Sequence, residues 1–173
     1  EPALQNWFVR AWSMLRYFTI WTNILVGILM LFVANGRRIS ANWQATAVLN
    51  IALTGVIFRV LLAPDQPLQG LPGWPDAIFH VVVPILTLGW WIVWGDKALR
   101  WGQVYMWLIW PLTYCVYALL RGAIDGKYPY FFLDIGQFGA GQVATNILGL
   151  IGVFAGTGLL LALLARILPA PQP

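Results

Sequence analysis

Five long apolar stretches constrain this chain more than any other feature of its 173 residues. A helix that crosses a bilayer needs about 20 mainly apolar residues, and each stretch comes close to that length or exceeds it. The sequence therefore predicts an all-α fold, a polytopic transmembrane helical bundle with about five spans in one domain, residues 1–173. The spans are expected near residues 15–34, 43–62, 77–94, 103–120 and 143–168.

Composition supports the same fold. Hydrophobic residues make up 60% of the chain and charged residues only 9%, whereas soluble domains carry roughly a quarter charged residues. So few charges cannot cover a surface in water, so the surplus apolar surface must face lipid. In lipid only helices and closed barrels satisfy every backbone N–H and C=O. These apolar runs are too long and too continuous for barrel strands.

The basic residues indicate an orientation. Five crossings place one basic set on one side: Arg37, Arg38, Lys97, Arg100 and Arg166. The opposite side carries Asp65 and Asp76, together with Arg10, Arg16, Arg121 and Lys127. The positive-inside rule favours the first side, with the C-terminus, as cytoplasmic. The net charge of +4 contains no dominant basic run, so we expect membrane lipids and no nucleic acid as partners.

Cysteine and tryptophan add two expectations. Cys115 is the only cysteine and lies in an apolar segment, which excludes an intramolecular disulfide and a cysteine metal cage. We expect no metal site and no cofactor. The 11 tryptophans fall mostly near span ends, as in an aromatic belt at the two membrane interfaces. Aromatic walls for a pigment or quinone are the alternative.

Gly152 and Gly156 form a small-xxx-small pair that predicts close helix packing.

Polar residues gather at the span ends of one side. Intramembrane polar groups are costly and commonly line a cavity or pair with each other, although each could merely reach the headgroups. The connection 121–142 is expected to cover the same side with Tyr128, Tyr130 and Asp134. The span-end residues are Thr19, Thr22, Asn23, Arg59, His80, Arg121 and Asn146.

His80 is the only histidine, so any imidazole chemistry must use it. Asp76 precedes it by four residues, on the same face of a helix. The Asp76 carboxylate could orient His80, or could simply complement the positive end of the helix. Pro84 follows His80 by four residues and has no N–H, which predicts a kink that opens space beside the histidine. Pro111 predicts a similar kink below Tyr114 and Tyr117.

Two threonines are candidate nucleophiles. Thr19, Thr22 and Asn23 share one helix face, at positions i, i+3 and i+4. A membrane threonine commonly bonds back to its own helix, and it becomes a nucleophile only when a base takes its proton. His80 is the available base. Arg59 and Arg121 could hold a carboxylate or an oxyanion, or could extend to lipid phosphates.

Three segments, in order along the chain, resemble the androgen-induced-gene-like family of multi-span membrane proteins. The first is residues 16–23, Arg-Tyr-Phe-Thr-Ile-Trp-Thr-Asn, and the second is residues 79–84, Phe-His-Val-Val-Val-Pro. The third combines Trp110-Pro-Leu-Thr-Tyr, Arg121-Gly and residues 128–134, Tyr-Pro-Tyr-Phe-Phe-Leu-Asp. Together they extend over most of the chain, which looks like a bacterial member and would then belong in the inner membrane.

The resemblance implies a reaction. Eukaryotic members are threonine hydrolases that cleave fatty acid esters of hydroxy fatty acids with a threonine and a histidine. The resemblance carries the nucleophile to Thr19 and the histidine to His80, with Thr22 as the alternative nucleophile. Family members usually have a further span ahead of the threonine, where this sequence has residues 1–14.

Two functions from different classes follow. One is an intramembrane hydrolase of lipid esters, with a threonine nucleophile, a histidine base and a lipid ester as substrate. The alternative is a non-catalytic membrane subunit of an energy-converting or photosynthetic complex, in which other subunits are partners and a partner helix replaces the front span. A transporter is a weaker option because no internal repeat supports it.

Overall fold

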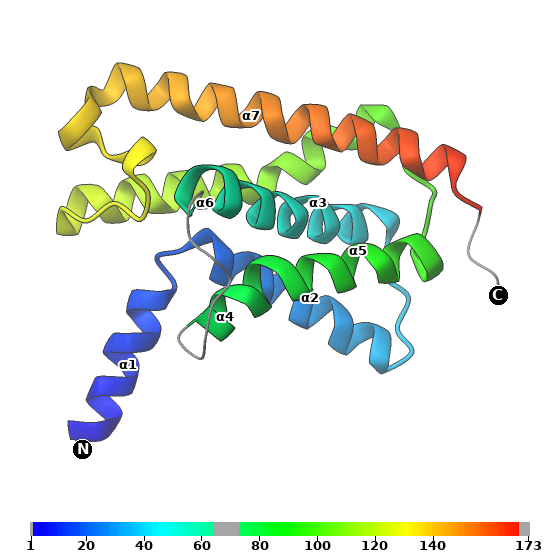
Figure 1. Ribbon diagram of the computed structural model, residues 1–173, viewed down its shortest axis with the longest axis horizontal. Helices are drawn as coiled ribbons and strands as arrows, with labels where there is room; N and C mark the ends of the chain where they lie inside the picture. The colour runs from blue at the N-terminus through cyan, green and yellow to red at the C-terminus, as the bar shows by residue number, and fades with distance from the viewer. Residues whose placement is uncertain (1, 64–72, 170–173) are drawn as a thin grey trace.

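The computed structural model describes residues 2–63 and 73–169, with side chains from residue 6 onward. These residues form helices and no strand, which confirms the all-α prediction (Figure 1). The α-helices are α1 (Pro2–Met14), α2 (Phe18–Ala34), α3 (Ala41–Ile57), α4 (Trp74–Ala77), α5 (Val83–Trp94), α6 (Val104–Asp125) and α7 (Ile135–Ile167). Two π-helical turns, η1 (Phe58–Leu62) and η3 (Ile78–Val82), and two 3₁₀ turns, η4 (Trp101–Gln103) and η5 (Phe131–Leu133), join them.

Four continuous helical segments are long and apolar enough to cross a membrane: Ala41–Leu62, Trp74–Trp94, Trp101–Asp125 and Ile135–Ile167. A fifth candidate combines Asn6–Met14 with Phe18–Ala34, two helices bent by 93° at a short break. The spans correspond to the five predicted stretches, with ends that differ by several residues. The chain is therefore an integral membrane protein, with α2, α3, α5, α6 and α7 arranged as a bundle (Figure 1).

The last two spans are longer than predicted. The connection expected at residues 121–142 shrinks to 126–134, because α6 continues to Asp125 and α7 begins at Ile135. The Asp134 side chain accepts a hydrogen bond from the Gln137 N–H and caps α7. Gly139 interrupts the helix with a φ of 74°, a left-handed conformation that glycine adopts without strain. The turn before Gly139 therefore departs from the axis of the rest of α7.

The two π turns arise next to each other. In η3 the Val83 N–H donates to the carbonyl of Ile78, and in η1 the Ala63 N–H donates to the carbonyl of Phe58. Each turn holds one residue more than an α-helical turn, a distortion frequent at functional sites. Pro84 lies two residues after the end of η3, so the kink predicted from Pro84 takes the form of a π turn that contains His80.

Tryptophans serve both the surface and the core. Trp91 and Trp107 are fully buried and anchor the main apolar cluster between α3, α5, α6 and α7. Six others have exposed side chains, all but Trp7 near helix ends, consistent with an interfacial belt: Trp7, Trp12, Trp43, Trp74, Trp94 and Trp101. The belt expectation therefore describes only part of the set.

Close packing of α7 does not use the predicted glycine pair. A Cβ added at Gly152 or Gly156 would meet nothing within 4 Å in the described part of the chain. Gly158 instead packs tightly, since a Cβ there would lie 2.9 Å from the Val104 side chain. The prediction for Gly152 and Gly156 is therefore wrong within this chain, because α7 turns that face away from the other helices.

Candidate active site

The Thr19 hydroxyl and the Nε2 atom of His80 lie 3.0 Å apart. Thr19 is in the first turn of α2 and His80 is in η3, 61 residues later in the chain. Both positions are at the same end of the bundle, where α2 begins and α5 approaches it (Figure 1). The distance falls within the range expected for a nucleophile and its base, so the spatial expectation is confirmed.

Hydrogen bonding of the histidine ring identifies its tautomer. Nδ1 of His80 lies 3.0 Å from the backbone carbonyl oxygen of Asp76. A carbonyl oxygen can only accept, so Nδ1 carries the proton of the neutral ring and donates to it. Nε2 is then an acceptor, and the Thr19 O–H donates to it. The pair is arranged for proton transfer from threonine to imidazole.

The Asp76 carboxylate plays a smaller part than its spacing suggested. Its Oδ1 lies 4.0 Å from Nδ1 of His80, beyond hydrogen-bond distance, and the side chain is 55% exposed. Asp76 also occupies the first turn of α4, where a carboxylate complements the helix dipole. The main chain of Asp76, rather than its side chain, orients the imidazole.

Helix α3 and its π turn form the wall behind the histidine. The Phe58 ring stacks on the His80 ring, with centroids 3.6 Å apart and planes 10° apart. Gly55 lies against the His80 main chain, since a Cβ added there would be 2.5 Å from the His80 carbonyl oxygen. Pro84 leaves that carbonyl without its usual helical donor. The space that the kink was expected to open is thus filled by Gly55 and Phe58.

Thr22 does not share the position of Thr19. Its side chain is fully buried, and its hydroxyl lies 3.2 Å and 3.0 Å from the carbonyl oxygens of Phe18 and Thr19. It also lies 3.1 Å from the Thr54 hydroxyl, which donates to the Asn50 carbonyl. A hydroxyl has one proton to donate, and for Thr22 these neighbours use it. The geometry favours Thr19 over Thr22 as the nucleophile.

Asn23 and Asn146 stabilise the surrounding backbone. The Asn23 amide donates to the carbonyl of Thr19 at 2.8 Å. The Asn146 amide donates to the carbonyl of Phe132 at 2.9 Å and ties η5 to α7. Both were placed on this side by the sequence, and both act on main-chain atoms near the site.

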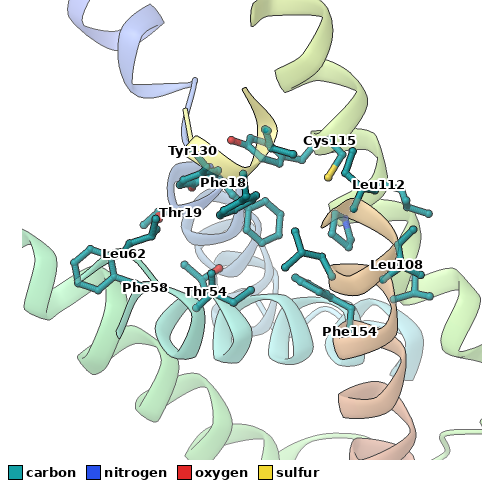
Figure 2. A pocket seen from close by; sticks show the side chains of 18 residues that line it. Phe18, Thr19, Thr54, Phe58, Leu62, Leu108, Leu112, Cys115, Tyr130 and Phe154 are labelled. Carbon is teal, nitrogen blue, oxygen red and sulfur yellow. The ribbon is translucent and has the colours of Figure 1, made fainter. Parts of the chain in front are cut away.

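An apolar cavity of about 60 Å³ adjoins Thr19. Figure 2 shows Thr19 and Phe18 on one side of it and Leu108, Leu112 and Phe154 on the other. Its lining is mainly aliphatic and aromatic, with few polar atoms, and His80 is not part of it. Thr19 therefore separates the histidine from the cavity. The lining residues are Phe18, Thr19, Thr54, Ile57, Phe58, Leu62, Leu108, Pro111, Leu112, Tyr114, Cys115, Tyr130, Phe132, Leu133, Ile147, Leu150, Ile151 and Phe154.

Tyr130 brings a second hydroxyl to Thr19. The phenol lines the cavity, accepts a hydrogen bond from the Phe18 N–H at 3.0 Å and interacts with the Thr19 hydroxyl (Figure 2). Burial raises the pKa of the Tyr130 phenol, although the hydrogen bond from Phe18 opposes this shift. A phenol with a raised pKa keeps its proton at neutral pH and can donate it in a hydrogen bond.

The two arginines do not reach the cavity lining. Arg59 lies in η1 and donates to the carbonyl of Ala63 at 3.3 Å. Arg121 is buried, donates to the Tyr117 hydroxyl and lies 3.7 Å from the Asp125 carboxylate. Its guanidinium also sits 4.3 Å from the centre of the Trp12 ring. The geometry assigns Arg121 to holding α1 and α6 together rather than to binding a product at Thr19.

Sequence reasoning missed Gly55 and Phe58 as residues of this site. The sequence around a glycine in an apolar helix does not indicate which segment will pack against it. Phenylalanine is common in membrane spans, so its presence does not indicate a site. Tyr130 was placed on the correct side but without a role.

Among residues 2–63 and 73–169, no three His, Cys, Asp or Glu side chains gather in a way that could hold a metal ion. No family model, curated protein or solved structure matches the chain.

Proposed function

We propose that this protein is an intramembrane hydrolase of lipid esters, with Thr19 as nucleophile and His80 as general base. One observation supports the proposal above the others: a threonine hydroxyl donates to an unprotonated imidazole nitrogen beside an apolar cavity. A threonine is a weak nucleophile unless a base takes its proton. An apolar lining suits the acyl part of a lipid and disfavours polar substrates.

In the proposed reaction, the Thr19 oxygen attacks the ester carbonyl carbon while His80 Nε2 takes the hydroxyl proton. The C=O electron pair moves to the carbonyl oxygen, and the Tyr130 O–H donates a hydrogen bond to this developing oxyanion. The bond to the alcohol oxygen then breaks, and the imidazolium returns the proton to the leaving alcohol. His80 then takes a proton from water, whose oxygen attacks the carbonyl carbon of the acyl-Thr19 ester. The bond between this carbon and the Thr19 oxygen breaks, the imidazolium returns the proton to that oxygen, and the fatty acid leaves.

Lipid access is consistent with the surroundings of the site. The cavity contacts α2, α3, α6 and α7, helices that also expose large apolar side chains toward lipid. A substrate dissolved in the bilayer could therefore approach from within the membrane. For the orientation, the basic residues Arg37, Arg38, Lys97 and Arg100 support a cytoplasmic C-terminus. The resemblance to bacterial family members supports an inner-membrane location. The site would then lie in the outer leaflet.

The test uses the purified protein in liposomes with a fluorophosphonate probe and a fluorogenic fatty acyl ester. Wild-type protein is expected to bind the probe covalently at Thr19 and to hydrolyse the ester. Thr19→Ala and His80→Ala should each reduce both signals to background, because a nucleophile and its base act as a unit. Thr113→Ala is the matched control, since it removes an exposed hydroxyl that bonds back to its own helix.

Two results would overturn the hydrolase. One is labelling that persists in folded Thr19→Ala protein. The other is a folded wild-type protein that neither reacts with the probe nor cleaves acyl esters of any tested chain length. A non-catalytic subunit of a larger membrane complex would then be the better description, and co-purifying membrane subunits would be its signature.

A further inference from the structure

Helix α1 leaves the bundle nearly at a right angle. The segments Asn6–Met14 and Phe18–Ala34 are bent by 93° relative to one another, and Figure 1 shows α1 pointing away from the other helices at the Thr19 end. The long helices of the bundle cross the membrane, so their axes lie roughly along the membrane normal. A helix perpendicular to α2 therefore runs roughly parallel to the membrane surface, at the leaflet that contains Thr19 and His80.

The side chains of α1 are sorted by polarity around its axis. With 3.6 residues per turn, Trp7, Phe8, Ala11 and Trp12 fall on one face. The opposite face carries Asn6, Arg10 and Ser13. All seven are exposed, including 69% of Trp7 and 76% of Phe8. Apart from the Trp12 ring, over which Arg121 packs, the rest of the described protein leaves this apolar face uncovered.

Two contacts secure the C-terminal end of α1 to α6. Arg16 forms an ion pair with Asp125, with 2.6 Å between Nη2 and Oδ2, and it also donates to the carbonyl of Lys127. The Arg121 guanidinium packs over the Trp12 ring. The hydrogen bond to Asp125 raises the pKa of the Arg16 guanidinium, although burial opposes this shift. These contacts hold α1 at the end of the bundle, and the side chains described from Asn6 to Ala11 stay exposed.

We propose that α1 is a lipid-binding helix that lies in the interface of the leaflet containing the candidate site. Its apolar face, Trp7, Phe8, Ala11 and Trp12, enters the acyl region, while Arg10 on the polar face meets headgroup phosphates. Tryptophan and a cationic polar face are typical of such helices.

Lipid, rather than another protein, is the occupant that the residues favour. The described polar face of α1 contains Arg10 and no acidic side chain, and Arg16 lies just beyond its end. Anionic headgroups complement that charge. The apolar face is also level with the end of a bundle whose own span ends carry exposed tryptophans, including Trp74. Headgroup depth is where such aromatic rings reside.

The experiment places spin labels on single-cysteine variants of the whole chain in a Cys115→Ala background. The protein is reconstituted in vesicles of phosphatidylcholine and phosphatidylglycerol. Accessibility to oxygen, which concentrates in lipid, is compared with accessibility to a water-soluble nickel chelate. Labels at Phe8 and Ala11 are expected to show a several-fold higher oxygen-to-nickel ratio than labels at Asn6 and Ser13. Ile28 in α2 provides the deep lipid reference.

Three outcomes would overturn the proposal. Nickel accessibility at all four positions would place α1 in water, and a depth that increases steadily along the helix would make it part of a span. Labels at Phe8 and Ala11 that neither reagent reaches would indicate a protein partner. A second measurement guards against perturbation by the label. Phe8→Asp should shift the Ala11 label toward nickel accessibility, whereas Asn6→Asp should not. None of these readouts depends on hydrolase activity.

Discussion

Gly55 in α3 packs directly against the backbone carbonyl of His80, so closely that a Cβ would lie 2.5 Å from the carbonyl oxygen. Heavy atoms do not approach to that distance without a hydrogen bond, and the obstacle is main chain rather than a flexible side chain. The contact fixes how near the π turn η3 comes to α3. The position of the imidazole relative to Thr19 depends on that approach.

Gly55→Ala is therefore expected to separate η3 from α3 and to weaken the bond between Thr19 and His80. Overpacking of this kind commonly costs about 1–3 kcal/mol of stability. Hydrolysis should fall by more than the unfolded fraction explains, because the base moves away from the nucleophile. Thermal unfolding and ester turnover are measured together.

Gly152→Ala is the matched control for that substitution, since a Cβ at Gly152 meets nothing within 4 Å. It should leave stability and turnover close to wild type, or raise stability slightly because alanine favours helix. Equal effects of the two substitutions would show that the contact between Gly55 and His80 has no special role.

Asp76→Asn is expected to reduce turnover by less than about tenfold, which is about 1.4 kcal/mol. The carboxylate lies 4.0 Å from the ring nitrogen and is largely exposed, while the Asp76 carbonyl does the orienting. In a serine-protease triad, where the carboxylate bonds directly to histidine, the same change costs about 10⁴-fold. Steady-state kinetics decide between these magnitudes, and a triad-sized loss would contradict orientation by the main chain.

Tyr130→Phe should lower kcat by about 10²–10³-fold, the effect of removing one donor to an oxyanion. KM should change little, because this hydrogen bond strengthens only as the oxyanion forms. The variant also removes the acceptor for the Phe18 N–H, so unfolding is measured alongside. Tyr105→Phe, at an exposed position on α6, serves as control. A raised KM with unchanged kcat would instead indicate that Tyr130 only shapes the cavity.

The membrane arrangement predicts opposite accessibility for Ser40 and Lys127. Ser40 precedes α3 at the end of the bundle away from Thr19, and Lys127 follows α6 at the Thr19 end. In a Cys115→Ala background, an impermeant maleimide added to intact cells should label Lys127→Cys and spare Ser40→Cys. Labelling of both from one side would refute the assignment of spans. Gln69, a natural choice for the same assay, lies outside the described residues.

The length and continuity of the apolar stretches determined the fold class and the approximate spans, because backbone groups in lipid must bond within their own helix. The parity of five crossings likewise placed Thr19, His80, Arg121 and Asp134 at one end of the bundle. These properties depend on residues near one another in the chain. The distortion at Pro84 was also predictable, since a proline lacks a backbone N–H whatever its surroundings.

Tertiary structure decided which polar groups meet. The resemblance favoured Thr19, but the residues themselves left Thr22 as an alternative nucleophile, since both lie on the same face of one helix. Packing of α3 gave the Thr22 hydroxyl a neighbour in Thr54, and packing of η3 brought His80 to Thr19 instead.

Similarly, the sequence left open whether the Asp76 carboxylate orients His80 or only complements the helix dipole, and whether Arg121 binds a product or extends to headgroups. Contacts between distant segments decide where these side chains lie. The bend of 93° before α2 is another feature that the sequence did not predict. Arg16 and Trp12 contact the end of α6 there, and no single stretch of sequence reveals these contacts.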